Sequence, residues 1–159
     1  MFKKFNYLLF TLFNIGKLPA SGTLGSIFAV IFYIIFYNFL PILGFIIIIL
    51  VTFFYSLIFL QRTLSSFSNE DPKEIVIDEF IGQLLPLIIC NGNLSLILLS
   101  FLTFRFFDIS KLFPANIFDK KIKGPLGIIG DDVVAGIYSF ITIYLTKLYI
   151  WQLKKLLKS

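Results

Sequence analysis

A stretch without a single charge, residues 42–60, is the feature that most restricts how this chain can fold. Its 19 residues are close to the length that an α-helix needs to cross the hydrocarbon core of a bilayer. Further apolar runs occupy residues 27–40, 94–107 and 133–150. They do not alternate in polarity, as the strands of a membrane barrel would. The pattern therefore predicts membrane helices.

The composition supports the same fold class. Hydrophobic residues make up 58% of the 159 residues and charged residues 14%, and the mean hydropathy is +0.93. A soluble chain of this size could not cover so much apolar surface. We expect an all-α integral membrane protein that forms a single domain over residues 1–159. Its predicted form is a compact bundle of four to five transmembrane or partly embedded helices, with an interfacial helix over residues 1–13.

The connections predict how the helices are ordered. A polar loop is expected at residues 61–70, followed by a helix from near Pro72 to about Cys90 and a turn at residues 91–93. Residues 94–107 would then return as the second half of a hairpin, and residues 112–130 are expected to form a loop. Five crossings would put the C-terminal lysines opposite the N-terminal ones, against the usual charge bias. The number of spans therefore stays open.

Two pairs of acids stand where apolar stretches begin, and a glycine follows each pair one helical turn later. Acids at such a boundary need a cation, a proton or water to keep them there. The glycine shares a helix face with an acid and would let another helix or a ligand approach closely. The residues are Asp78, Glu79 and Gly82 in the first case and Asp131, Asp132 and Gly136 in the second.

The residue types restrict the chemistry. The chain has no histidine and one cysteine, Cys90, so a His-dependent triad, a His-ligated zinc site and a disulfide framework are excluded. Asp108 should join the four acids on one face, and a cluster of carboxylates without His or Cys ligands favours Mg²⁺ or Mn²⁺. Arg105 and Lys111 should lie on that face too, although Arg105 and Asp108 could simply form an ion pair within one helix.

Residues 21–26 could form a phosphate site at the start of the next helix. Ser21 or Thr23 could cap the next helix, and the free backbone N–H groups there would attract a phosphate. An ordinary helix cap is the alternative. Together with the cations beside the acids, this segment suggests a phosphorylated substrate, and the membrane location suggests a lipid phosphate.

Four blocks resemble the phosphatidylglycerophosphatase A family. They are residues 23–26 (TLGS), 75–82 (IVIDEFIG), 105–111 (RFFDISK) and 127–136 (GIIGDDVVAG). The resemblance implies a Mg²⁺-dependent, multi-pass enzyme of the bacterial inner membrane with its active site on the cytoplasmic face. It would hydrolyse phosphatidylglycerophosphate to phosphatidylglycerol and phosphate. The chain departs from the family pattern at residues 20–22, at Leu112 and at Ile129, which concerns loop geometry more than chemistry.

Each candidate residue then has a predicted role. Asp78, Glu79, Asp131 and Asp132 would form the metal shell, and Asp108 would be a further ligand or the base for water. Arg105 and Lys111 would hold the phosphate, assisted by Thr23 and Ser26. We expect a metal-activated water to attack, which would make Asp108, Arg105 and Asp131 the catalytic residues. The partner is a membrane phospholipid. No nucleic acid is expected, because the net charge of +5 fits cytoplasmic loops and acidic lipid, and no protein partner can be inferred.

Three other functions fit some of these observations. An ion-coupled transporter would use the carboxylates as a cation relay, but it predicts acids near the middle of spans rather than at their ends. A CDP-alcohol phosphotransferase would need a longer acidic signature that is absent from the sequence. A non-enzymatic membrane subunit is the third alternative, and activity retained after Asp78→Asn or Asp131→Asn would favour it over an enzyme.

Overall fold

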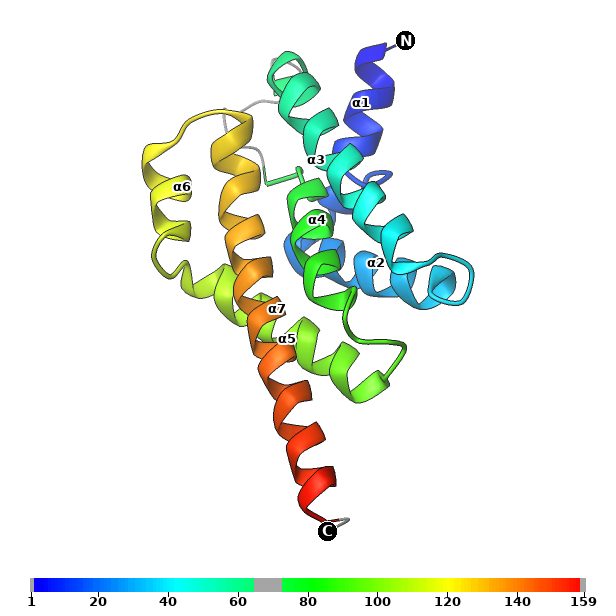
Figure 1. Cartoon of the computed structure of the whole chain (residues 1–159). Coiled ribbons are helices and arrows are strands. Elements are labelled where there is room, and N and C mark those ends of the chain that lie inside the picture. Colours follow the sequence, from blue (N-terminus) through cyan, green and yellow to red (C-terminus); the bar gives the residue numbers. More distant parts are fainter. Residues whose placement is uncertain (1, 65–72, 158–159) are drawn as a thin grey trace.

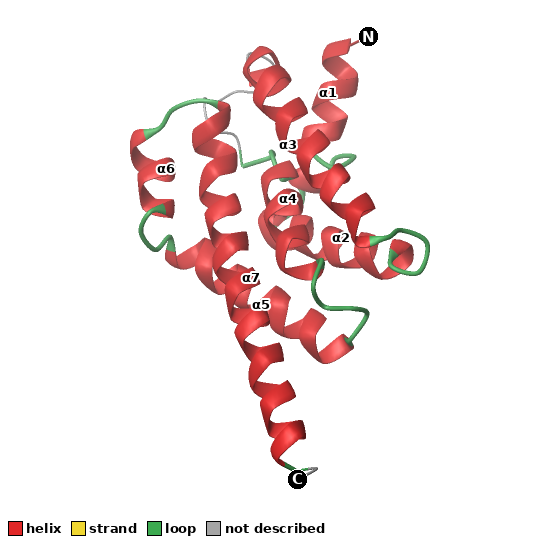
Figure 2. Ribbon diagram, in the orientation of Figure 1, coloured by secondary structure: helices red, strands yellow, loops and turns green. Residues whose placement is uncertain are grey.

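A computed structural model describes residues 2–64 and 73–157, and every regular element in these ranges is a helix (Figures 1 and 2). The all-helical prediction is confirmed for this part of the chain. The elements are α1 (Phe2–Phe10), the 3₁₀ turn η1 (Ile15–Lys17), α2 (Ser21–Phe36), α3 (Ile42–Leu64), α4 (Ile77–Leu87), α5 (Leu94–Ser110), α6 (Ala115–Lys121) and α7 (Pro125–Leu156).

Two of the described helices, α3 and α7, are long and apolar enough to cross a membrane. They have 23 and 32 residues, whereas the apolar α2 has 16. Only 17% of the most apolar part of α3 is buried inside the bundle, against 50% for α7. Helix α3 therefore lies at the periphery, and α7 forms part of the core.

Helix α4 is the buried centre of the bundle. It has 11 residues, and all except Glu79 and Leu85 are buried. At 1.5 Å per residue it is roughly 17 Å long, too short to cross a bilayer alone. A helix that is buried on nearly all sides belongs to the core. Helices α2 and α7 supply most of its surroundings.

Two glycines allow α4 and α7 to touch. A Cβ added to Gly136 would lie 2.4 Å from the carbonyl oxygen of Gly82, and one added to Gly82 would lie 2.6 Å from the carbonyl oxygen of Asp132. Small residues at such a crossing let two backbones approach closely. The close approach predicted for both glycines is therefore confirmed, and the approaching group is the partner helix.

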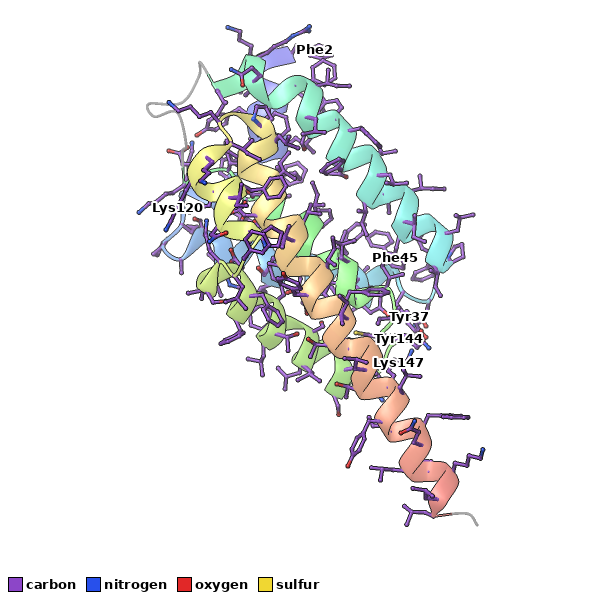
Figure 3. All side chains as sticks on the ribbon, turned by 60° about the vertical axis from the view of Figure 1, so that its left-hand side comes forward. Phe2, Tyr37, Phe45, Lys120, Tyr144 and Lys147 are labelled. Carbon is purple, nitrogen blue, oxygen red and sulfur yellow. The ribbon has the colours of Figure 1, made fainter. Side chains whose placement is uncertain are left out.

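Helices α2, α3, α4, α5 and α7 run alternately between two ends of the bundle. The backbone N–H of Gly92, after α4, donates to the Tyr33 hydroxyl near the end of α2 at 3.2 Å. Lys147, late in α7, donates to the carbonyl oxygen of Ile89 at 2.7 Å. Figure 3 shows Tyr37 and Lys147 toward this end and Phe2 and Lys120 toward the other. The chain thus passes through the bundle in α2, α3, α4, α5 and α7, and α7 ends opposite the N-terminus (Figure 1).

The loop predicted over residues 112–130 is wrong. Helix α6 and the first residues of α7 occupy most of it, and Asp131 and Asp132 lie inside α7 rather than at its start. Pro125 takes the first position of α7, where a missing N–H costs nothing. Gly127, inside the segment predicted to be a loop, is a packing position, because a Cβ there would meet the Ile122 carbonyl oxygen at 1.9 Å.

Two other boundaries also differ from the prediction. Helix α3 continues through Leu64, so residues 61–64 are not a loop, and the rest of that predicted loop lies outside the described residues. Pro72 lies outside them as well, and α4 runs from Ile77 to Leu87 rather than from residue 72 to 90. The predicted turn at residues 91–93 is confirmed, and Asn93 caps α5 by accepting from the Leu96 N–H at 3.1 Å.

Candidate functional site

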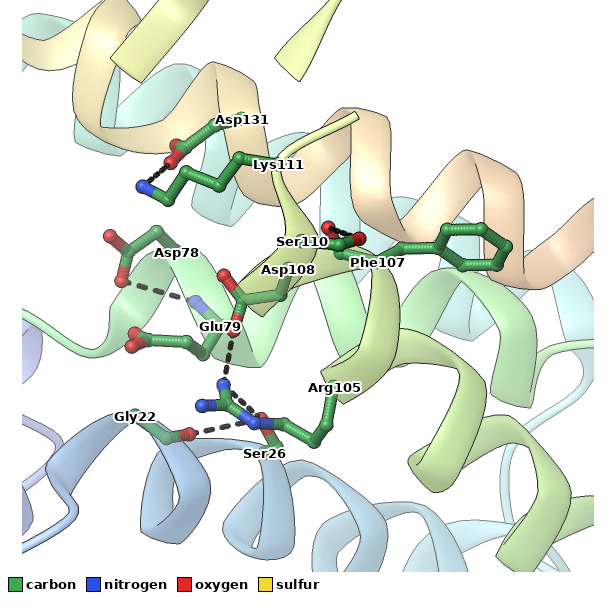
Figure 4. Close-up of polar contacts among 10 residues, drawn as sticks. All are labelled: Gly22, Ser26, Asp78, Glu79, Arg105, Phe107, Asp108, Ser110, Lys111 and Asp131. Atoms are coloured by element: carbon green, nitrogen blue, oxygen red, sulfur yellow. Dashed lines mark hydrogen bonds and ion pairs between the residues drawn. The ribbon is translucent and has the colours of Figure 1, made fainter. Parts of the chain in front are cut away.

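A cavity of about 670 Å³ opens where the first turns of α2 and α4 meet the end of α5, α6 and the first part of α7. The structure brings most of the predicted site residues to its wall (Figure 4). These are Thr23, Asp78, Glu79, Arg105, Asp108, Lys111, Asp131 and Asp132. The hairpin of α4 and α5 returns Arg105 to the level of Asp78, as the turn at residues 91–93 predicts.

Three carboxylates form the tightest acidic group. One oxygen each from Asp78, Glu79 and Asp132 lies within 4.8 Å of the others. Asp78 is 8% exposed and Asp132 is 4% exposed, so water can do little to screen their repulsion. The Gly82–Gly136 contact sets their spacing, because each glycine lies one helical turn beyond an acid of the group.

The donor atoms of this group fit a hard divalent cation. All are carboxylate oxygens, the ligands that Mg²⁺ prefers. Oε2 of Glu79 is buried and has no hydrogen-bond partner among the described residues, which leaves an acceptor available. Three acids this close need a positive charge between them, so the group could hold a metal.

Asp131 lies beside this group but has a different partner. Its Oδ2 accepts a hydrogen bond from Nζ of Lys111 at 2.7 Å, while Lys111 also pairs with Asp119. Partial burial works against the Lys111 ammonium, but the two carboxylates outweigh it and raise the pKa of Lys111 above its ordinary value. The other oxygen of Asp131, Oδ1, is buried without a partner among the described residues. Asp131 can therefore accept a further ligand while Lys111 holds it in place.

Arg105 forms the opposite wall of the cavity. Its guanidinium pairs with Asp108 one turn later on α5, so the simple intrahelical ion pair does exist. The same Nη1 lies 3.5 Å from the Ser26 hydroxyl, which donates to the Gly22 carbonyl oxygen at 2.9 Å. Nε of Arg105 is buried and has no partner among the described residues. The guanidinium is thus fixed by two helices and still has a donor available for a ligand.

The structure separates Ser26 and Ser21 from the roles considered for them. Ser26 is fully buried and is not among the residues that line the cavity, so it contacts Arg105 from behind. Ser21 is the first residue of α2, and its hydroxyl donates to the Lys73 carbonyl oxygen at 2.8 Å. Neither Ser21 nor Thr23 caps α2, because the preceding Ala20 takes the N-cap position without a side-chain hydrogen bond.

Three charged residues of the cavity wall are absent from the prediction: Lys73, Asp119 and Lys123. The lysines at residues 120, 121 and 123 fit a cytoplasmic loop or an attraction to acidic lipid equally well, and nothing in their spacing distinguishes Lys123 from its neighbours. Asp119 reaches the wall from α6 and pairs there with Lys111, so its position depends on a helix in a segment predicted to be a loop.

Comparison with known proteins identifies the family. A family model described as Phosphatidylglycerophosphatase A matches residues 8–147. The phosphatidylglycerophosphatase A of Haemophilus influenzae is 37% identical over 127 residues, covering 79% of this chain and 78% of that protein. The protein of the same name from Escherichia coli is 31% identical over 135 residues, covering 84% and 78%. A putative phosphatidylinositol-3-phosphatase of Bacteroides thetaiotaomicron is 35% identical over 143 residues, covering 86% and 89%.

No solved structure matches the chain. The family match covers all four sequence blocks and leaves out only the two chain ends. It includes every residue of the cavity wall named above. The resemblance seen in the sequence is therefore confirmed, and the chain belongs to the phosphatidylglycerophosphatase A family.

Proposed function

We propose that this chain is a lipid phosphatase that hydrolyses phosphatidylglycerophosphate to phosphatidylglycerol and phosphate. It would work as a single multi-pass domain in the bacterial inner membrane, with the cavity at the cytoplasmic face. The observation that carries the proposal is one cavity that joins a buried group of three carboxylates to Arg105 and Lys111. The names of the relatives from H. influenzae and E. coli give the substrate.

Asp78, Glu79 and Asp132 would hold a divalent cation, with Mg²⁺ the best match to oxygen-only ligands. Asp131 would join them through its unpartnered oxygen. When bound, the cation would compensate the carboxylates, polarise the phosphate and lower the pKa of water.

The chain's own side chains would orient the phosphate monoester. Arg105 offers its buried Nε and its fork to the phosphate oxygens, and its contacts with Asp108 and Ser26 limit its movement. Lys111 keeps its positive charge on the opposite side of the cavity, because its pKa is raised above the ordinary value. Thr23, in the first turn of α2, adds a hydroxyl to the same wall.

A carboxylate must also accept the proton of the attacking water. Asp108 is suited to this role because it lines the cavity next to Arg105, and the ion pair orients its carboxylate. The buried surroundings of the cavity strengthen all of these electrostatic interactions.

The ion-coupled transporter receives no support. The family and the relatives named above carry phosphatase names, and the acids gather at one end of the bundle instead of forming a chain through it. A relay across the membrane would require further acids along the passage.

Phosphate release from phosphatidylglycerophosphate in neutral detergent micelles tests the proposal. We expect release by the purified protein with Mg²⁺, none with EDTA, and none from Asp131→Asn or Asp78→Asn. The Lys120→Gln variant changes an exposed lysine and should match the wild type, so it serves as the control for purification and assay. No release from a folded wild-type preparation, or release unaffected by EDTA, would refute the metal mechanism.

A further inference from the structure

The charges on the cavity wall leave two lysines without an internal role. Three of the acids form the candidate metal group. The remaining acids are matched inside the protein, Asp108 by Arg105 and both Asp119 and Asp131 by Lys111. Lys73 and Lys123 also line the cavity, but neither forms an ion pair with any residue in the described ranges 2–64 and 73–157.

These two lysines lie at the rim of the cavity, on segments that are anchored. Both are exposed, as is Asp119, whereas Arg105 and the other acids of the wall are less exposed. The backbone of Lys73 is held by the hydroxyl of Ser21 from the first turn of α2. Lys123 precedes Gly124 and Pro125, where α7 begins, and Gly127 packs against the carbonyl oxygen of Ile122. The two lysines thus line the cavity from anchored backbone positions.

We infer that Lys73 and Lys123 form a second anion-binding subsite, which binds the phosphodiester of the lipid while Arg105 and Lys111 bind the terminal monoester. The inference rests on the proposed function and specifies its substrate class. The enzyme would select lipids whose head group carries a monoester beyond the diester, and it would discriminate against phosphatidic acid, which has a monoester but no diester.

The size of the cavity agrees with a whole head group. Its volume of about 670 Å³ lies within the range of pockets that enclose complete small molecules, roughly 300–1,000 Å³. A site for one phosphate alone would need far less space. Apolar side chains of Ile75, Ile109 and Ile122 share the wall and offer contacts to the carbon atoms between the two phosphates.

The names of the relatives point to the same chemistry. Two of the relatives are named for phosphatidylglycerophosphate, and a third is named as a putative phosphatase of phosphatidylinositol 3-phosphate. The two lipids differ in the polyol, but both place a monoester on a head group that a diester links to the lipid. A subsite for the diester recognises what these substrates share and leaves the choice of polyol to other contacts.

Steady-state kinetics in neutral detergent micelles, with lipid given as mole fraction, test this inference. The variants are Lys73→Gln, Lys123→Gln and the double variant, with Lys120→Gln as the matched control. Lys120 is exposed on α6 and lies outside the cavity wall. Each protein is assayed with phosphatidylglycerophosphate, phosphatidylinositol 3-phosphate and phosphatidic acid.

We expect each cavity variant to raise KM for phosphatidylglycerophosphate by roughly threefold to tenfold with little change in kcat, since one charge-assisted contact is lost. Activity on phosphatidic acid, which we expect to be low in the wild type, should not change in the variants, and Lys120→Gln should match the wild type throughout.

An equal loss on phosphatidic acid, or the same loss from Lys120→Gln, would mean general attraction to acidic lipid and would overturn the inference. Unchanged KM values in the double variant would overturn it too, while the proposed function would stand. If the wild type releases phosphate from none of the three lipids, the proposed function itself fails.

Discussion

The contact between Gly82 and Gly136 predicts that a single methyl group added at Gly136 should disturb the site. In Gly136→Ala the new Cβ would begin 2.4 Å from the carbonyl oxygen of Gly82, whereas ordinary contacts begin at 3.4 Å. The obstacle is backbone, so it cannot rotate away. Helices α4 and α7 must separate by about 1 Å, and the distance between Asp78 and Asp132 must grow with them.

Two effects of this separation can be estimated. Overpacking of a buried contact costs about 1–3 kcal/mol, from which the better helix propensity of alanine subtracts about 1 kcal/mol. A displacement of about 1 Å in a catalytic constellation can lower the rate by ~100-fold. We therefore expect a modest loss of thermal stability in detergent, a large loss of kcat/KM for phosphate release, and a higher Mg²⁺ concentration for half-maximal activity.

Gly44→Ala is the matched control, because Gly44 also lies in a long apolar helix but its Cβ would find its nearest neighbour at a normal 3.5 Å. It should be as active as the wild type and equally or more stable. If Gly136→Ala behaved like Gly44→Ala in both assays, the argument that glycine contact sets the acid spacing would be refuted.

Three further predictions concern the charged groups. Asp132→Asn should abolish phosphate release yet raise the melting temperature in EDTA, because it removes one of three clustered buried charges; a lower melting temperature would contradict this. Arg105→Lys should lower kcat/KM by roughly 10- to 100-fold, since an ammonium lacks the planar fork; wild-type kinetics would argue against a bidentate role. Because the folded pKa of Lys111 is raised, the stability lost in Lys111→Met should be constant below the unfolded pKa near 10.4 and should shrink only above it. A difference that shrank between pH 7 and 9 would contradict that direction.

Much of this site could be predicted from spacing, because the relevant signals are local. An acid followed four residues later by glycine places both on one helix face, and this spacing predicted both the cluster and the helix contact at Gly82 and Gly136. The turn at residues 91–93 predicted that Arg105 would return to the level of Asp78. Both inferences need only helix geometry and one chain reversal.

The errors arose where one residue type serves two purposes. Glycine marks turns, but it also permits close packing, so Gly127 and Gly130 do not by themselves distinguish a loop from a packed helix. Lysine near a membrane marks topology, but it can also line a binding cavity, so Lys123 was hidden among its neighbours. Only tertiary contacts separate these uses, since the local sequence is the same in both cases.

The arrangement of charges explains why an acidic site can still attract a phosphate. Asp108 and Asp131, at the edges of the cluster, are each matched by a cation that is itself fixed, Arg105 or Lys111. Most of the uncompensated charge therefore lies on three carboxylates within 4.8 Å, where one divalent cation would neutralise much of it. With that cation bound, the formal charges of the six acids and four basic residues on the wall would balance, so the cavity as a whole would no longer repel a phosphate. Metal binding should accordingly precede substrate binding, and lipid affinity measured in EDTA should fall even for variants that keep every contact to the phosphate.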